Sequence, residues 1–195
     1  MSTVAVSTPR PVLADVVSKS LLSDAILVVS AAAFVGLLAQ ISFYIHPFVV
    51  PFTGQTLGVL LIGSTLGIRR ALASMAVYVV AGLAGLPWFA SGASGYSAAL
   101  FGYLLGFVLS VTLMSWLASQ GNDRNVVSAL GLFVIGELAI YAIGVPWLAL
   151  DLHMSLAKAI TVGMTPYLIF DLAKAVVAGT LLPATWRFVD RSRKD

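Results

Sequence analysis

Residues 25–44 read AILVVSAAAFVGLLAQISFY, a stretch that contains no charged side chain. The hydrocarbon core of a bilayer is about 30 Å thick, so a helix needs roughly 20 apolar residues to cross it. The stretch is too long for the apolar core of a signal peptide, and no small-residue cleavage site follows it. It therefore predicts a membrane-spanning helix, for which Ser23 or Asp24 offers the N-cap.

The composition of the whole chain agrees with this prediction. Of the 195 residues, 59% are hydrophobic and 10% are charged, whereas an average soluble domain has roughly a quarter charged residues. These values exclude an ordinary soluble enzyme, a disordered chain and a nucleic-acid-binding domain. The chain has no cysteine and its two histidines lie far apart, so no metal site is expected. It also has no phosphate-binding loop and should not hydrolyse ATP itself.

Further apolar segments predict an all-α fold, an integral membrane bundle of six helices. The expected spans are 25–44, 52–68, 71–86, 98–118, 126–145, and a last one that begins at Thr165-Pro166 and ends near residue 186. The second span is expected to end at Arg69 and Arg70, and the fifth at Pro146. Residues 151–160 could add a short amphipathic helix. The chain then divides into an N-terminal tail (1–24), a membrane domain (25–186) and a basic C-terminal tail (187–195).

The distribution of basic residues predicts the orientation of the bundle. Nine of the 11 Lys and Arg residues fall on one side of the six spans: Arg10, Lys19, Arg69, Arg70, Arg124, Arg187, Arg191, Arg193 and Lys194. Lys158 lies on the opposite side, and Lys174 lies within the last span. Because Lys and Arg concentrate in cytoplasmic loops, both termini are expected in the cytoplasm. The expected location is the cell membrane, with several passes.

Three ionisable residues lie inside the expected spans. Each of Glu137, Asp171 and Lys174 costs roughly 2.5–3.5 kcal/mol at mid-span on insertion scales. Asp171 and Lys174 are three residues apart and share a helix face, as Glu137 does with Tyr141, four residues on. Two more polar side chains, Gln55 and Tyr78, are expected at the same depth in the outer half of the membrane. The pattern predicts a cavity that opens outward, although Asp171 and Lys174 could also merely neutralise each other.

One short motif favours a catalytic alternative. Gly92-Ala93-Ser94-Gly95 resembles the serine motif of rhomboid intramembrane proteases. A serine nucleophile needs a base within hydrogen-bond reach, and rhomboids supply a histidine from the last span. Here the last span has no histidine, and His153 lies in the preceding loop. A flexible Gly/Ser loop is the simpler interpretation, and a structural membrane subunit without a ligand is a further alternative.

Four blocks of sequence carry a more specific resemblance. They are PFTGQTLGVLL at 51–61, GYLLGF at 102–107, YAIGVPWL at 141–148 and PYLIFDLAK at 166–174. Together they closely resemble the BioY family of biotin transporters, which are substrate-binding S components of energy-coupling factor (ECF) transporters. The likeness covers roughly residues 25–185, in order along the chain.

The resemblance implies a function and a set of partners. It implies six helices, an external biotin pocket, and contact of Asp171 and Lys174 with the ureido ring. It also implies a transmembrane coupling protein and two cytoplasmic ATPases as partners, with biotin as the transported ligand rather than a cofactor. The surrounding lipid is a further partner, and no nucleic acid is expected.

The chain departs from the family at Ala99 and Leu100, where Pro-Thr is usual, and at Phe170, where Gly is frequent. Because Phe170 is expected to crowd its turn, an S component for another vitamin stays an alternative.

Biotin's chemistry suits the polar residues of the expected cavity. Its ureido group has two N–H donors and one carbonyl acceptor, so Asp171 can accept from an N–H and Lys174 can donate to the oxygen. Lys158, on the outer side, is one option for the carboxylate. The ring could be enclosed by aromatic side chains near the outer mouth. The candidates are Trp88, Phe89, Tyr96 and Trp147.

A smooth face on the first span predicts either close packing inside the chain or a docking surface for another membrane protein. Small side chains let helices approach closely within a membrane. The residues are Ala31, Ala32, Ala33 and Gly36, and we expect them to contact the coupling protein.

Overall fold

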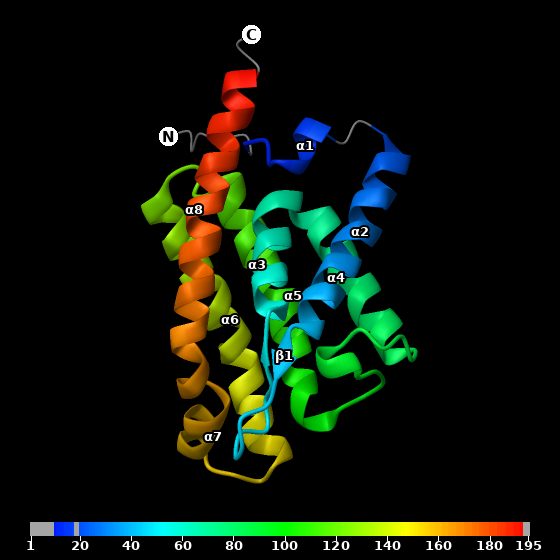
Figure 1. Ribbon diagram of the computed structural model, residues 1–195, viewed down its shortest axis with the longest axis vertical. Helices are drawn as coiled ribbons and strands as arrows, with labels where there is room; N and C mark the ends of the chain where they lie inside the picture. Colours follow the sequence, from blue (N-terminus) through cyan, green and yellow to red (C-terminus); the bar gives the residue numbers. More distant parts are fainter. Residues whose placement is uncertain (1–9, 18–19, 193–195) are drawn as a thin grey trace, which may run out of the picture.

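Helices form almost all of the computed structural model, which describes residues 10–17 and 20–192 (Figure 1). The longer helices are α2 (Leu21–Gln40), α3 (Gln55–Leu66), α4 (Ile68–Leu83), α5 (Ala98–Ser119), α6 (Val126–Asp151) and α8 (Leu168–Ser192). The shorter elements are α1 (Ala14–Val17), α7 (Leu156–Gly163), the 3₁₀ turns η1 (Ala90–Gly92) and η2 (Thr165–Tyr167), and the strands β1 (Ser42–Phe43) and β2 (Phe52–Thr53). The two strands form an antiparallel hairpin in which Ser42 lies opposite Thr53.

Successive long helices run in alternating directions. As a result, α1 and the C-terminal end of α8 lie at one end of the bundle, and the hairpin and α7 lie at the other (Figure 1). In the part of the chain that the structure describes, four helical segments are long and apolar enough to cross a membrane: Leu21–Gln40, Ala98–Ser119, Val126–Asp151 and Leu156–Arg191. Helix α3 has only 12 residues, about 18 Å at 1.5 Å per residue.

The short α3 leaves room for a cavity within the bundle. Its first residue, Gln55, follows the hairpin directly, so the hairpin takes up the depth that a longer helix would occupy. Helix α3 packs on α5, and α5 packs along α6, which in turn packs on α8. The contact between α5 and α6 is close, because a Cβ on Gly106 would lie 2.6 Å from the carbonyl oxygen of Ile140.

Two helix boundaries differ from the prediction because of local capping and packing. Helix α2 begins at Leu21, since Ser20 is the N-cap and exchanges hydrogen bonds with Ser23 in a capping box. Helix α6 was expected to stop at Pro146 but continues to Asp151. Proline removes one hydrogen bond from a helix interior, and burial of the flanking Val145 and Leu148 holds the helix together in spite of that loss.

Two further boundaries also need correction. Arg69 and Arg70 do not end the second span; they lie in the first turn of α4, and the break between α3 and α4 is Gly67, whose φ of +76° favours glycine. The last helix extends beyond residue 186 to Ser192. The amphipathic segment expected at 151–160 is helical from Leu156 to Gly163.

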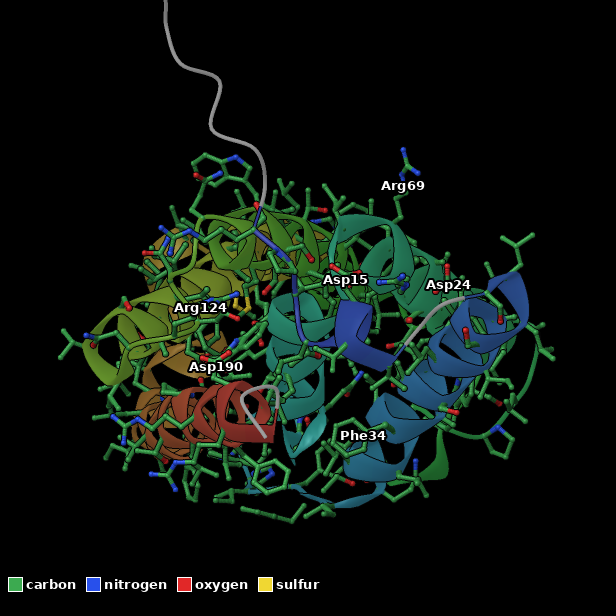
Figure 2. All side chains as sticks on the ribbon, turned by 90° about the horizontal axis from the view of Figure 1, so that it is seen from above. Asp15, Asp24, Phe34, Arg69, Arg124 and Asp190 are labelled. Carbon is green, nitrogen blue, oxygen red and sulfur yellow. The ribbon has the colours of Figure 1, made fainter. Side chains whose placement is uncertain are left out.

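Ionic contacts tie the N-terminal segment to the end of the bundle that carries α1. Arg70 contacts Asp15 at 2.7 Å and Asp24 at 2.6 Å. The guanidinium of Arg124 donates to the carbonyl of Pro11 at 3.2 Å. Figure 2 looks onto this end and shows Arg69 pointing away from the bundle. Other basic residues expected on this side, Lys19, Arg193 and Lys194, lie outside the described residues.

The predicted docking face of the first span is wrong for three of its four residues. Ala31, Ala32 and Gly36 are buried within the chain, and a Cβ on Gly36 would lie 3.1 Å from Trp88. Helix α2 packs on α3, on α4 and on the loop after α4, so these small residues serve packing inside the chain. Only Ala33 of the four is partly exposed.

Candidate functional site

A cavity lies between the helices on the hairpin side of the bundle. It contains about 930 Å³ of empty space, its open mouth included. The hairpin and the α4–α5 loop form its mouth, and α3, α5, α6 and α8 form its body. Its lining residues are Tyr44, Val50, Pro51, Thr53, Gln55, Thr56, Phe89, Ala90, Ala93, Ser94, Gly95, Ser97, Leu100, Tyr103, Leu104, Phe107, Glu137, Ile140, Tyr141, Gly163, Tyr167, Asp171 and Lys174.

An ion pair from α8 forms the polar centre of the cavity wall. The Nζ atom of Lys174 lies 2.9 Å from Oδ1 of Asp171 and donates to the Thr56 hydroxyl at 2.8 Å. The hydroxyl of Tyr141 donates to the other oxygen of Asp171. The side chains of Asp171 and Lys174 are 7% and 19% exposed, so the pair is largely withdrawn from water. The predicted shared helix face is thus confirmed, and α6 supplies a third member of the cluster.

Glu137 completes the ionisable groups of the cavity wall. It lies one turn before Tyr141 on α6 and is 6% exposed. Neither carboxylate oxygen has a hydrogen-bond partner of ordinary geometry. Glu137 and Asp171 also border a second, shallow groove on the outer side of the α6–α8 contact. The structure therefore brings both carboxylates and the lysine to one region, as the sequence predicted.

Gln55 lies in the cavity wall, and Tyr78 lies behind it. Gln55 lines the cavity at the start of α3, and its Nε2 donates to the Tyr78 hydroxyl at 2.8 Å. Tyr78 is fully buried in α4 and does not line the cavity. It can therefore act on a ligand only through the orientation of Gln55.

Three of the expected aromatic residues lie outside the cavity lining. Trp88 packs against α2 and donates to the Tyr78 carbonyl at 2.9 Å. Trp147 donates to the Ala98 carbonyl at 2.8 Å, and Tyr96 is 64% exposed. Phe89, the fourth candidate, does line the cavity. Lys158 is exposed on α7 and is not part of the lining.

Several lining residues were not assigned to the site by the sequence analysis. Tyr103 reaches across the cavity from α5 and donates to the Gly163 carbonyl at 2.8 Å. Tyr167 precedes Asp171 by about one turn and donates to the Val50 carbonyl of the hairpin. Its spacing from Asp171 was the available indication. Tyr103 lies on α5, and no pattern within one helix gives the rotation of that helix toward its neighbours.

Contacts between loops organise the mouth of the cavity. The hairpin is joined to η1 by a 2.9 Å contact between the hydroxyls of Ser42 and Ser91. An aromatic cluster holds the hairpin against α8, with Phe52 centred 5.1 Å from Phe170 and 4.3 Å from Tyr167. Phe170 therefore packs on the hairpin and does not crowd the cavity, which corrects the expectation. Leu100, the other departure, does line the wall.

These features define a class: a polytopic helical membrane protein with a polar-centred cavity that opens at one end of the bundle. A sequence model described as the BioY family matches residues 9–191, and the chain belongs to this family.

Curated relatives support the assignment. The biotin transporter BioY2 of Lactococcus lactis is 30% identical over 77% of this chain and 83% of its own length. The biotin transporter BioY of Thermotoga maritima is 38% identical over 68% of this chain and 78% of its own. The probable biotin transporter BioY of Bacillus subtilis is 35% identical over 77% of this chain and 84% of its own.

The fold has a counterpart among solved structures. A crystal structure of the S-component for biotin from an ECF-type ABC transporter superposes with a TM-score of 0.77, covering 87% of this chain and 95% of the other. At 18% identity, this likeness establishes the fold alone.

Membership in a transporter family also decides the question of catalysis. The chain is not an enzyme, and the rhomboid alternative is set aside. Ser94 lines the cavity mouth, whereas neither histidine is among the lining residues.

Proposed function

We propose that this chain is the biotin-binding S component of an ECF transporter and captures biotin from outside the cell. The observation that carries the proposal is the Asp171–Lys174 pair in the wall of an enclosed cavity, 2.9 Å apart and almost withdrawn from water. Buried ionisable groups within membrane proteins usually mark a ligand or ion pathway. The names of the relatives indicate which ligand this is.

The cavity offers complementary chemistry to each part of biotin. Asp171 can accept from a ureido N–H, and Lys174, which has one donor beyond its two bonds, can donate to the carbonyl. Tyr141 fixes the Asp171 carboxylate, and Gln55 offers a further polar contact. Apolar side chains are available for the bicyclic body. They include Leu100, Leu104, Phe107 and Ile140.

The proposed topology has six membrane-crossing helices, α2 to α6 and α8, with both termini in the cytoplasm of a cell-membrane protein. Alternating helix directions support an even number of crossings (Figure 1). Basic residues support the orientation, since Arg69, Arg70 and Arg124 lie at the α1 end and Lys158 at the hairpin end. The cavity mouth at the hairpin end then faces outward.

The proposed partners are a transmembrane coupling protein and two cytoplasmic ATPases. The chain has no phosphate-binding loop, so ATP-driven release of biotin needs a separate motor. Affinity purification of the tagged chain from cells that express the coupling protein and both ATPases should recover all of them. Purification of the chain alone from such cells would contradict this partnership.

Equilibrium binding tests the proposed ligand. We expect labelled biotin to bind the purified chain in detergent and to be displaced by unlabelled biotin. Other vitamins in excess should not displace it. The specific reason to test them is Leu100, which lines the wall where the family usually has a different residue. Displacement of biotin by another vitamin at lower concentration would favour that vitamin, and no binding by a folded chain would overturn the biotin assignment.

A further inference from the structure

Glu137 is the one ionisable group of the cavity wall whose polar atoms are both left without a partner in the described chain. Its side chain projects from α6 into the region where α3, α6 and α8 meet, and the residue is 6% exposed. The Thr56 hydroxyl accepts from Lys174 and can donate its single O–H to at most one oxygen of Glu137, so at least one Glu137 oxygen stays without a donor. A purely structural residue at this position would be better replaced by an apolar one, because an unpaired buried polar group destabilises the fold.

The hydrogen bonds around Glu137 show which donors and acceptors of the cavity wall remain available to a ligand. Tyr141 donates to one oxygen of Asp171 and Lys174 to the other. Lys174 also donates to Thr56, so one of its three N–H groups stays available. The cavity wall therefore combines a carboxylate held by two donors, a Glu137 carboxyl group with at least one oxygen free to accept, and an ammonium with one donor to spare.

We propose that Glu137 is the second acceptor of the ligand site and receives one ureido N–H, while Asp171 receives the other. Lys174 donates to the carbonyl between them. The inference rests on the proposed function and deepens it, because it makes the site selective for a ring that presents two N–H groups on either side of one carbonyl. Two carboxylates and one ammonium match two donors and one acceptor.

Because Glu137 is buried, its side chain has to move before it can contact a ligand. Its two oxygens each have less than 1 Å² of accessible surface, so its side chain has to turn toward the cavity to meet a ligand. Three rotatable bonds allow that movement without a shift of α6. The ligand then supplies the hydrogen bond that the protein does not.

Two biotin derivatives test the inference, each methylated at one of the two ureido nitrogens. In each derivative the methyl group replaces the hydrogen of one ureido nitrogen, so that nitrogen can no longer donate a hydrogen bond. We expect both derivatives to bind the wild-type chain about tenfold more weakly than biotin, since each leaves one buried carboxyl oxygen without its hydrogen bond. In Glu137→Ala, biotin itself should bind at least tenfold more weakly. One derivative should then bind as well as biotin does, because its missing donor has lost its acceptor. In Asp171→Ala, the other derivative should be the tolerated one.

Controls separate a binding role from a folding defect. Glu137→Leu should unfold at the same or a higher temperature than the wild type without biotin, since it removes an unpaired buried group. Ile135→Ala, on the exposed side of α6 and outside the cavity lining, should bind all three ligands as the wild type does. The inference would be overturned if Glu137→Ala bound biotin normally, or if it kept both methylation penalties. A wild-type chain that fails to bind biotin would overturn the proposed function as well.

Discussion

Asp171 and Lys174 lie within two turns of α8 and face the same cavity. Removing two charges from water costs more than their attraction returns unless further hydrogen bonds satisfy them. Thr56 and Tyr141 provide these bonds. Two charged groups held in fixed positions beside a cavity are more typical of a binding site than of a structural contact.

Removing the pair one residue at a time should distinguish these roles. We expect Asp171→Leu to destabilise the chain by about 3–5 kcal/mol, because Lys174 is left buried without its counter-charge. The double variant Asp171→Leu with Lys174→Met should recover most of that loss but should not bind biotin. Unfolding temperatures measure the stability of both variants, and biotin titrations measure their binding. A double variant as unstable as the single one would show that the pair itself stabilises the fold.

Asp123, in the loop between α5 and α6, is buried at the opposite end of the bundle. Burial raises its pKa above the ordinary 3.8, although the hydrogen bond from Trp186 acts in the other direction. Since the folded chain then binds the proton more tightly than the unfolded one, stability falls as pH rises from the ordinary pKa through the raised one.

Replacing Asp123 by asparagine should remove this pH dependence. Asp123→Asn keeps an oxygen for Trp186 but cannot ionise, so we expect a flatter plot of unfolding temperature against pH. The variant should be the more stable protein at pH values above the raised pKa. A wild-type stability that rises with pH over this range, or identical plots for both proteins, would contradict the expectation.

Some of the site could be predicted at the scale of single residues, and some could not. Spacing within one helix indicated the shared face of Asp171 and Lys174, because helix geometry fixes it. The positions of Trp88, Tyr96 and Trp147 depend on how neighbouring helices are rotated. Their sequence neighbours place them near the mouth, but they contact backbone carbonyls or solvent. Phe170 was misjudged for the same reason, since it packs on the hairpin.

At the scale of elements, apolar segments located every long helix but not its ends. Pro146 looked like a terminator, but packing against α5 holds α6 together on both sides of it. Ser20 has an ordinary capping sequence that lay outside the expected span. The alanines of α2 showed that a small-residue face exists, but the pattern does not tell whether its partner is another helix of the same chain. In the structure α2 packs on other parts of the same chain, namely α3, α4 and the loop after α4.

The α5–α6 contact gives a matched test of close packing. A Cβ on Gly106 would lie 2.6 Å from the Ile140 carbonyl oxygen, whereas one on Gly131 would meet nothing within 4 Å. We expect Gly106→Ala to destabilise the chain by about 1–3 kcal/mol, because the two helices must move apart. Gly131→Ala should leave stability unchanged or slightly higher. Thermal unfolding in one detergent compares them, and equal effects of the two substitutions would contradict the packing described here.

At the scale of the whole molecule, the two ends of the bundle differ in charge. The α1 end carries Arg70 and Arg124 in contacts with the N-terminal segment, and the hairpin end carries the cavity mouth. The same asymmetry was visible in the sequence, since loop charge depends only on the order of spans and loops. The polar residues of the spans also predicted a cavity, but not its shape, because that shape depends on the short α3 and on the path of the hairpin.

Labelling of single cysteines tests the orientation. The chain has no cysteine of its own, so each introduced thiol is the only target. On intact cells, we expect a membrane-impermeant maleimide to label Tyr96→Cys, in the α4–α5 loop at the hairpin end. Asp190→Cys, near the end of α8, should be labelled only after permeabilisation. The reverse pattern would place the cavity mouth in the cytoplasm, and labelling of both on intact cells would contradict an exclusively cytoplasmic C-terminal end.

The most direct test of the central claim, that this cavity holds biotin, is ligand protection of a thiol at its mouth. Ser94 is exposed and lines the cavity, whereas Tyr96 is exposed but does not. We expect biotin to slow maleimide labelling of purified Ser94→Cys at least tenfold and to leave Tyr96→Cys unaffected. The protection should disappear when Asp171→Ala is added to Ser94→Cys. Equal labelling rates of Ser94→Cys with and without saturating biotin would show that biotin does not occupy this cavity.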